Sequence, residues 1–430
     1  MRTLTLGQAA AVAITLAGTP IIARIYDPSE FGIAAFFVTV VTFSMPFATL
    51  TFDNGIMISK EDRAAVGVFR LGLLSVVGTA LFLLLVLLVL VFGGWLPPIL
   101  LALGGWLYLL PVALVVAGFS RMLESWSFRK RRHGGIAVAS VCAAAGTTGG
   151  RVGYGLVFGP TLAGLVSGYL FGAFARMLFL FNTGRSGLRQ ALALPDQAPI
   201  RVSLANHRDF ALLGTPTAVL ASLARNLPVF MLGLLYAPEI VGLFAISRAL
   251  IQRPTEALLT NIRRLSILRI GNLVNSGESP LRSFQRTITF LFAIGVVPAA
   301  VTFLYGGELV AWLLGDKWVE AGPYVELLVP MIFLSLVSAP SVAVYIACRQ
   351  QRIQLQNQIA GTIARIIAFL GIWAAGLEAY WAVVGYVSVG VVMSLIATYR
   401  AAKVLRDPEL GTRLAAVQAG VRVIGSEASE

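Results

Sequence analysis

The sequence is poor in the residues that most enzyme and metal sites use. Its 430 residues include only two cysteines, Cys142 and Cys348, far apart in the chain, and two histidines, His133 and His207, each beside basic residues. These spacings exclude a disulfide framework and contain no metal-ligand pattern. Charge is also scarce, because 12% of the residues are charged and 57% are hydrophobic, whereas a soluble domain carries about 25% charged residues. We therefore expect no metal, no cofactor and a surface that faces lipid.

Long apolar runs fill the chain. A helix needs about 20 apolar residues to cross the hydrocarbon core of a membrane. We predict twelve such spans at 4–23, 31–52, 66–91, 97–119, 136–158, 161–182, 210–235, 239–261, 285–304, 323–347, 356–376 and 379–399. The pattern predicts an all-α, polytopic membrane protein. Met1 lies just before the first run, so we expect no cleavable signal peptide and a first helix that acts as its own insertion signal.

The positions of the basic residues predict the orientation. A formal net charge of +13 is compatible with nucleic-acid binding, but almost all of this charge lies between alternate apolar runs. Only Arg24 and Lys317 fall between the other runs, so the positive-inside rule places both termini in the cytoplasm. We interpret basic runs such as residues 129–132 as determinants of topology and contacts with lipid headgroups, not as a nucleic-acid site. Residues 401–430 are predicted to form a cytoplasmic tail.

An internal repeat divides the chain. The segment 26–32, Tyr-Asp-Pro-Ser-Glu-Phe-Gly, returns at 236–242 as Tyr-Ala-Pro-Glu-Ile-Val-Gly. Weaker echoes pair the basic residues 129–132 with 349–352, and Gly-Thr before Arg151 with Gly-Thr before Arg365. We predict two homologous six-helix lobes, 1–208 and 209–400. Six is an even number, so the lobes share one orientation and enclose a central cavity, as in parallel-repeat transporters.

The predicted spans contain charges of one sign. An ionised residue near the bilayer centre costs about 3 kcal/mol or more and normally marks a substrate path. The acids fall near span ends, but arginines occur within the spans or at their edges: Arg225, Arg365, Arg151, Arg248 and Arg24. A cavity lined by guanidinium groups suits an anion, above all a phosphate, which can accept two hydrogen bonds from one planar fork. The alternative is that these side chains extend to the headgroups or donate to backbone carbonyls.

Two segments resemble a known family. Residues 20–32, Pro-Ile-Ile-Ala-Arg-Ile-Tyr-Asp-Pro-Ser-Glu-Phe-Gly, and residues 315–324, Gly-Asp-Lys-Trp-Val-Glu-Ala-Gly-Pro-Tyr, are similar to segments of the Wzx-type polysaccharide flippases of the multidrug/oligosaccharidyl-lipid/polysaccharide (MOP) superfamily. The chain departs from the pattern at Asp53-Asn54-Gly55-Ile56, where the family often has Glu-x-Ala-Ile.

The resemblance implies a transporter and not an enzyme. Its cargo would be a polyprenyl-diphosphate-linked oligosaccharide, moved across the cytoplasmic (inner) membrane of a bacterium by alternating access, with the five arginines holding the diphosphate. Membrane lipids, a polysaccharide polymerase and glycosyltransferases are the further partners it implies, and we expect a monomer. Two alternatives stay open: an ion-coupled drug or metabolite antiporter, which would need a carboxylate in the cavity, and a non-transporting scaffold of polysaccharide assembly.

Overall fold

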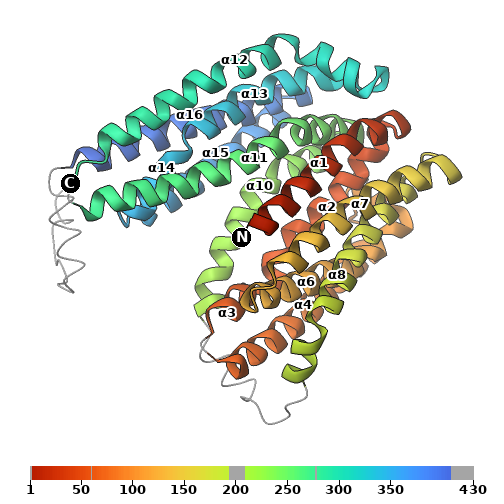
Figure 1. Ribbon diagram of the computed structural model, residues 1–430. Helices are drawn as coiled ribbons and strands as arrows, with labels where there is room; N and C mark the ends of the chain where they lie inside the picture. Colours follow the sequence, from red (N-terminus) through yellow and green to blue (C-terminus); the bar gives the residue numbers. More distant parts are fainter. Residues whose placement is uncertain (1, 60, 193–208, 277, 408–430) are drawn as a thin grey trace. The chain divides into compact units, whose positions relative to one another are not determined.

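The computed structural model describes residues 2–59, 61–192, 209–276 and 278–407. Within these ranges the chain forms helices joined by short connections, and no strand occurs (Figure 1). By their contacts the described residues group into two compact units: unit 1 has those within 2–246 and 310–321, and unit 2 has those within 247–309 and 322–407. The prediction of an all-helical membrane protein is confirmed. The predicted six-helix lobes 1–208 and 209–400 stay a prediction.

Unit 1 contains the helices of the N-terminal half and the first helix of the C-terminal half. They are α1 Arg2–Ile25, α2 Pro28–Thr49, α3 Phe52–Ile58, α4 Asp62–Phe92, α5 Pro98–Ala102, the 3₁₀ helix η1 Gly104–Leu109, α6 Leu110–Arg129, α7 His133–Phe158, α8 Leu162–Leu192, the π-helical turn η2 Phe210–Gly214, and α10 Thr215–Leu235. The start of α11 Pro238–Asn275 and the 3₁₀ helix η3 Asp316–Ala321 complete it. The main helix pairs are α7 with α8, α1 with α7, and α2 with α10.

Unit 2 contains the rest of α11 and most of the later helices. They are α12 Leu281–Leu314, whose last turn belongs to unit 1, α13 Gly322–Val337, α14 Ala339–Ala347, α15 Gln351–Ala374 and α16 Ala379–Arg406. Helix α16 packs on α13, α14 and α15. At one end of the unit, Phe284, Val344, Tyr345 and Leu405 form a buried apolar cluster.

All twelve predicted spans are helical, but their ends differ from the predictions. Helix α11 continues to Asn275 and α16 to Arg406, so the first residues of the predicted tail are helical; the tail from residue 408 onward lies outside the described residues. The span predicted at 323–347 is two helices separated at Ser338, and α3 was not predicted. The span predicted at 97–119 is divided among α5, the 3₁₀ helix η1 and the first half of α6. Polar residues extend a helix beyond the membrane without changing its hydrogen bonds, so hydropathy does not report where it ends.

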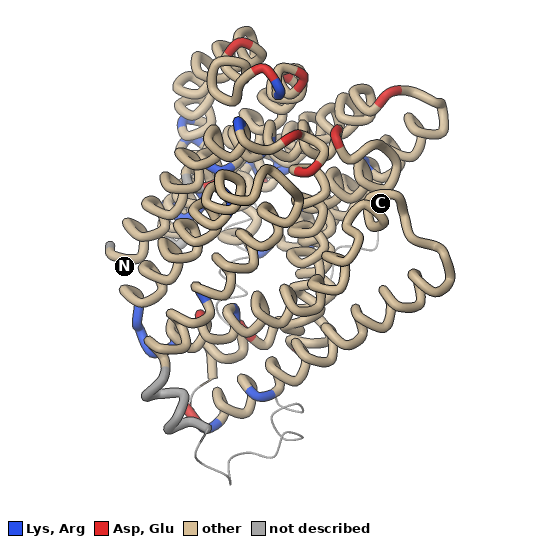
Figure 2. Tube along the Cα trace, turned by 90° about the vertical axis from the view of Figure 1, so that its right-hand side faces the viewer, with Lys and Arg blue, Asp and Glu red and all other residues tan. Residues whose placement is uncertain are grey.

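Ten of the described helical segments are long and apolar enough to cross a membrane, from a hydropathy of 3.0 in α4 down to 1.2 in α15. Two predicted spans, in α7 and α11, are also long, with 26 and 38 residues, but they do not belong to these ten. In Figure 2, long uncharged stretches run along the helices, and charged residues gather mainly near the helix ends. The chain is a multi-pass membrane protein.

The two copies of the repeated motif meet each other. A Cβ atom added to Gly32 would lie 1.9 Å from the carbonyl oxygen of Pro238, and one added to Gly242 would lie 1.9 Å from that of Pro28. The contact is reciprocal, because each glycine faces the proline of the other copy. Membrane helices approach this closely where their residues are small, so glycine at both positions lets the start of α2 cross the start of α11.

The two basic segments contain similar helix ends, but the residues that correspond differ from the predicted pairs. Arg131 and Arg349 both have a positive φ, 54° and 55°. Each follows a helix whose end carries the same two hydrogen bonds, Arg132 to Ser127 and Arg131 to Phe128 in one half, Gln350 to Tyr345 and Arg349 to Ile346 in the other. This is the Schellman arrangement that ends many helices. The structure therefore pairs Arg131 with Arg349, where the sequence suggested Arg129.

The same offset of 218 residues separates Gly172 from Gly390. A Cβ at Gly172 would contact the Thr147 hydroxyl, and a Cβ at Gly390 would lie 3.5 Å from a guanidinium nitrogen of Arg365. Thr147 and Arg365, which are separated by the same offset, thus lie near these two glycines, although the atoms nearest to a Cβ at Gly390 belong to Met331. The predicted echo between Arg151 and Arg365 stays a prediction.

We predict that Gly32→Ala sharply lowers the yield of folded protein. Its methyl group would overlap the Pro238 carbonyl, and separating the two helices should cost about 1–3 kcal/mol or more. Gly78→Ala is the control, because a Cβ at Gly78 meets nothing within 4 Å and alanine favours a helix. The measurement is the monodisperse fraction and melting temperature of detergent-purified protein. Wild-type behaviour of Gly32→Ala would contradict the close crossing.

Candidate functional site

The five predicted arginines divide between the units. Arg24, Arg151 and Arg225 lie in unit 1, and Arg248 and Arg365 lie in unit 2. Their surroundings differ, and the difference separates side chains that hold the fold together from side chains that are available to a ligand.

Arg225 is the most available of the five. It lies midway along α10, its side chain is exposed, and it has no hydrogen bond or ion pair with the described part of the chain. Beside it a polar cluster joins α10 to α2. The Thr42 hydroxyl lies 3.3 Å from Oδ1 of Asn226, Nδ2 of Asn226 donates to the Ser222 carbonyl over 2.9 Å, and the Ser222 hydroxyl lies 3.3 Å from the Thr42 carbonyl. An exposed arginine next to polar groups at mid-helix needs water or a polar ligand.

Thr42, Ser222 and Asn226 were not among the predicted site residues. Ser222 and Asn226 are four residues apart and so share a helix face, which is a signal that could have been used. Thr42 could not have been found in this way, because only the packing of α2 on α10 brings it to that face. We name Thr42, Ser222, Asn226 and Arg225 the α2–α10 cluster.

Arg365 lies within α15 and is half-buried. Its guanidinium carbon is 5.2 Å from the centre of the Tyr386 ring on α16, an arrangement in which cation and π-system attract each other. Its Nε is buried and has no hydrogen-bond partner among the described residues. The aromatic face holds the side chain in place without neutralising it, so the charge stays available.

Arg151 and Arg24 are used within the protein. Nε of Arg151 donates to the Leu165 carbonyl of α8 over 3.2 Å, and the Tyr26 hydroxyl donates to the Arg151 carbonyl over 2.7 Å. Burial raises the pKa of Tyr26, which keeps this hydroxyl protonated as the donor. Arg24 ends α1 and donates to the Trp312 carbonyl over 3.3 Å. Both follow the alternative in which an arginine donates to backbone carbonyls.

Arg248 begins a polar ladder along one face of α11. Its Nε donates to the amide oxygen of Gln252, whose nitrogen donates to the Glu256 carboxylate over 2.6 Å. The residues are spaced by four, so they stack on one face of the helix. Arg248 is therefore linked to an acid through an amide, and its charge is less available than that of Arg225.

Several acids near the helix ends are paired with bases. The buried Asp53 accepts from Arg121 over 2.9 Å, and Glu124 accepts from Arg176 over 2.9 Å. The role of Asp53, which departs from the family pattern, is thus to anchor α3 to α6. Among the described residues, no group of three or more His, Cys, Asp or Glu could hold a metal ion.

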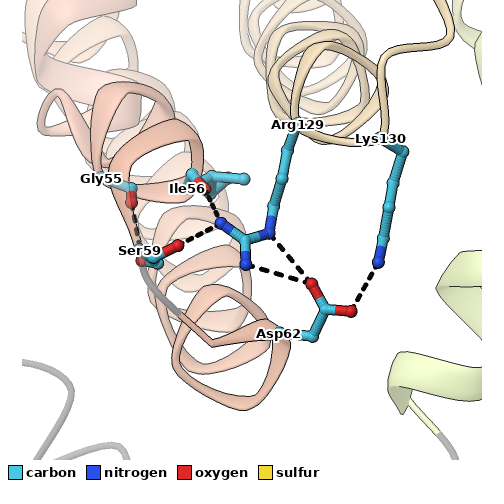
Figure 3. A network of polar contacts seen from close by, with 6 residues as sticks. All are labelled: Gly55, Ile56, Ser59, Asp62, Arg129 and Lys130. Atoms are coloured by element: carbon cyan, nitrogen blue, oxygen red, sulfur yellow. Dashed lines mark hydrogen bonds and ion pairs between the residues drawn. The ribbon is translucent and has the colours of Figure 1, made fainter.

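The basic run at residues 129–132 is tied into the protein more than predicted (Figure 3). Arg129 donates through Nε and Nη2 to one carboxylate oxygen of Asp62, at 3.1 Å each, while Lys130 donates to the other oxygen over 2.5 Å. Nη1 of Arg129 also donates to the carbonyls of Ile56 and Ser59. One guanidinium thus joins the end of α6 to the end of α3 and the start of α4. The interpretation of this run as a determinant of topology and a contact with headgroups did not include these bonds within the protein.

The two segments that carry the family resemblance lie against each other. Trp318 is fully buried, its indole nitrogen donates to the Ala23 carbonyl over 2.7 Å, and its ring meets that of Phe31 edge-on at 5.5 Å. Lys317 pairs with Asp27 over 2.7 Å. We call residues 310–321 the strap. They pack with unit 1, although the residues before and after them in the sequence belong to unit 2.

We predict that Trp318→Phe destabilises the protein by about 1–2 kcal/mol, the cost of leaving the Ala23 carbonyl without its buried donor. Trp312→Phe is the matched control, because Trp312 is 76% exposed and contributes only its backbone carbonyl, which the substitution keeps. Thermal unfolding in detergent measures both. Equal melting temperatures for the two variants would show that the indole hydrogen bond is unimportant.

We predict that Arg129→Ala lowers the free energy of unfolding by about 1–3 kcal/mol, because two carbonyls lose this donor and the Asp62 carboxylate keeps only Lys130. Arg63→Ala removes an equal charge from an exposed position nearby and should have little effect. Arg129→Lys tests the planar fork, since one ammonium group cannot reproduce the three-way contact. Full stability of the lysine variant in the same unfolding assay would refute a role for the fork.

Comparisons with known proteins agree with the fold. The chain is similar to an inward-facing MATE-family multidrug resistance transporter of the MOP superfamily, with 15% identity, a TM-score of 0.65 and coverage of 95% of this chain and 96% of that one. It is also similar to the lipid II flippase MurJ in an inward closed conformation, with 9% identity, a TM-score of 0.70 and coverage of 97% of this chain and 93% of that one. A MOP superfamily transporter from Pyrococcus furiosus matches with 14% identity, a TM-score of 0.58 and coverage of 94% of this chain and 95% of that one. At these identities the likeness concerns the fold. No curated protein matches the chain.

The family is shown by a different comparison. The model of a family described as "Polysaccharide biosynthesis protein" matches residues 21–323. This range includes most of the first resembling segment and nearly all of the second, as well as the α2–α10 cluster. It covers more than half of the 430 residues, and the chain therefore belongs to the polysaccharide biosynthesis protein family.

Proposed function

We propose that the protein is a Wzx-type flippase that moves a polyprenyl-diphosphate-linked oligosaccharide from the cytoplasmic to the periplasmic leaflet of the bacterial inner membrane. The observation that carries this proposal is Arg225, an exposed arginine at mid-helix without a partner among the described residues. Membership of a polysaccharide biosynthesis family supports a glycan cargo. A solved neighbour of the same fold is named a flippase of lipid II.

The chemistry required is binding and not bond making. A flippase lowers the barrier to moving a charged, hydrated headgroup through hydrocarbon, and every bond of the cargo survives. Arg225 and Arg365 are the two arginines best suited to hold the diphosphate, because a guanidinium can donate two hydrogen bonds to one phosphate. Arg248, Arg151 and Arg24 position helices and contribute positive potential. The protein acts by alternating access, as a monomer with both termini in the cytoplasm.

An antiporter for cationic drugs is less well supported. It needs a carboxylate that can exchange protons or ions within the spans, whereas Asp53 and Glu124 are paired with arginines. In the Pyrococcus furiosus transporter, a reversed polarity of the binding pocket is taken to suggest a different function. The available charges inside the predicted spans, those of Arg225 and Arg365, are positive. We therefore propose an anionic cargo.

We predict that Arg225→Ala and Arg365→Ala each lower transport about tenfold or more, because a charge-assisted hydrogen bond to phosphate contributes about 1.5–3 kcal/mol. Arg225→Lys should retain part of the activity, since it keeps the charge but not the fork. The assay uses proteoliposomes and a membrane-impermeant enzyme that modifies the oligosaccharide once it reaches the outer leaflet.

Arg264→Ala is the control for this prediction, because Arg264 is exposed and lies beyond the predicted span. All variants are compared at equal amounts of reconstituted protein. Normal transport by both alanine variants would rule out the arginine model. Failure of the wild type with several glycans, together with ion-driven uptake of cationic dyes, would favour the antiporter.

A further inference from the structure

Helix α12 carries a polar stripe that the proposed transport path does not use. A hollow of about 440 Å³ is lined by Arg282, Gln285, Arg286, Thr289, Phe290 and Ala293. These residues follow one another at intervals of three, one, three, one and three, so they lie along one face of the helix. The other face is occupied by the core of unit 2, in which Phe284 is buried with Leu281 and Ile288 packed beside it.

The charged groups of this stripe are without a partner among the described residues. Arg282, Gln285 and Arg286 are exposed, and none has a hydrogen bond or ion pair with the part of the chain that the structure describes. Arg282 lies in the first turn of α12, where the positive end of the helix dipole disfavours a cation. An anion bound there would face two guanidiniums and the dipole together. The electrostatic energy of the stripe is therefore unfavourable without a ligand, and a bound anion would lower it.

The lining residues at the C-terminal end of the stripe are apolar. Phe290 is 62% exposed, and Ala293 continues the stripe one turn further into the helix. The stripe begins at Arg282, just before the predicted span 285–304, and lipid headgroups border the ends of membrane spans. Basic side chains followed by apolar ones along a single face match a phosphate headgroup with a hydrocarbon chain attached.

We propose that this stripe is a binding site for a membrane lipid whose headgroup is a phosphate monoester or a diphosphate. Two guanidiniums one helical turn apart favour a headgroup with more than one negative charge. A phosphate monoester carries about −1.5 to −2 charges at pH 7 and a diphosphate carries at least as much, whereas a phosphodiester carries a single charge. The proposal goes beyond transport and does not depend on it, because the site would bind such a lipid whether or not the protein moves it.

Native mass spectrometry of the purified full-length protein tests the proposal. The probes are phosphatidic acid, polyprenyl phosphate, phosphatidylglycerol and inorganic diphosphate, each titrated separately. We expect the wild type to bind the two monoesters about tenfold more tightly than phosphatidylglycerol, and the Arg282→Ala/Arg286→Ala variant to lose about tenfold or more of that affinity. Arg264→Ala/Arg269→Ala removes the same charge from exposed positions of α11 and should bind as the wild type does.

Three results would overturn the site. The first is equal loss in both double variants, which indicates general charge attraction. The second is equal binding of phosphatidylglycerol and phosphatidic acid, which removes the selectivity for a monoester. The third is inorganic diphosphate binding as tightly as the lipids, which assigns the stripe to a soluble anion. Thermal unfolding of each variant shows whether it is folded, and Arg286→Lys, which keeps the charge, supplies a second test: it should lose affinity without losing stability.

Discussion

Hydrocarbon cannot solvate a charge, and this constraint accounts for much of the arrangement of polar groups in the protein. Asp53 and Glu124 are each paired with an arginine from another helix, and Arg151 donates to a carbonyl of α8. A paired or bonded group can remain in a membrane helix for structural reasons alone. Arg225 has no such partner among the described residues, so the same constraint that makes the others structural makes it a candidate for function.

The membrane also removes the hydrophobic effect as a force between helices, so packing must come from close approach. The reciprocal contact of Gly32 with Pro238 and of Gly242 with Pro28 is an instance of this. Equivalent residues of the two copies meet at an offset of 210 residues, while the later helix ends correspond at 218. The two copies of the motif thus form one reciprocal helix crossing, and the helices before Arg131 and Arg349 both end in a Schellman turn.

The sequence predicted the existence of the helices well and their surroundings poorly. Apolar runs identify a span because lipid demands them, and all twelve are helical. Hydropathy does not predict helix ends such as Asn275 and Arg406, because a helix can continue with polar residues outside the membrane. The partners of Arg24, Arg151 and Trp318 were not predictable, since each is a backbone carbonyl and every residue has one. Available and structural arginines look alike in a sequence, and only packing separates Arg225 from Arg151.

The strap explains why the family can be identified from two short segments while the cargo cannot. Trp318 and Lys317 from one segment contact Ala23, Asp27 and Phe31 from the other. A buried indole that donates to a carbonyl tolerates few substitutions, because losing either group leaves the other unpaired. Such residues are constrained by each other and not by a ligand. The two segments therefore hold residues 310–321 against unit 1, and the selectivity for a cargo that we propose depends on available side chains such as that of Arg225, which is exposed.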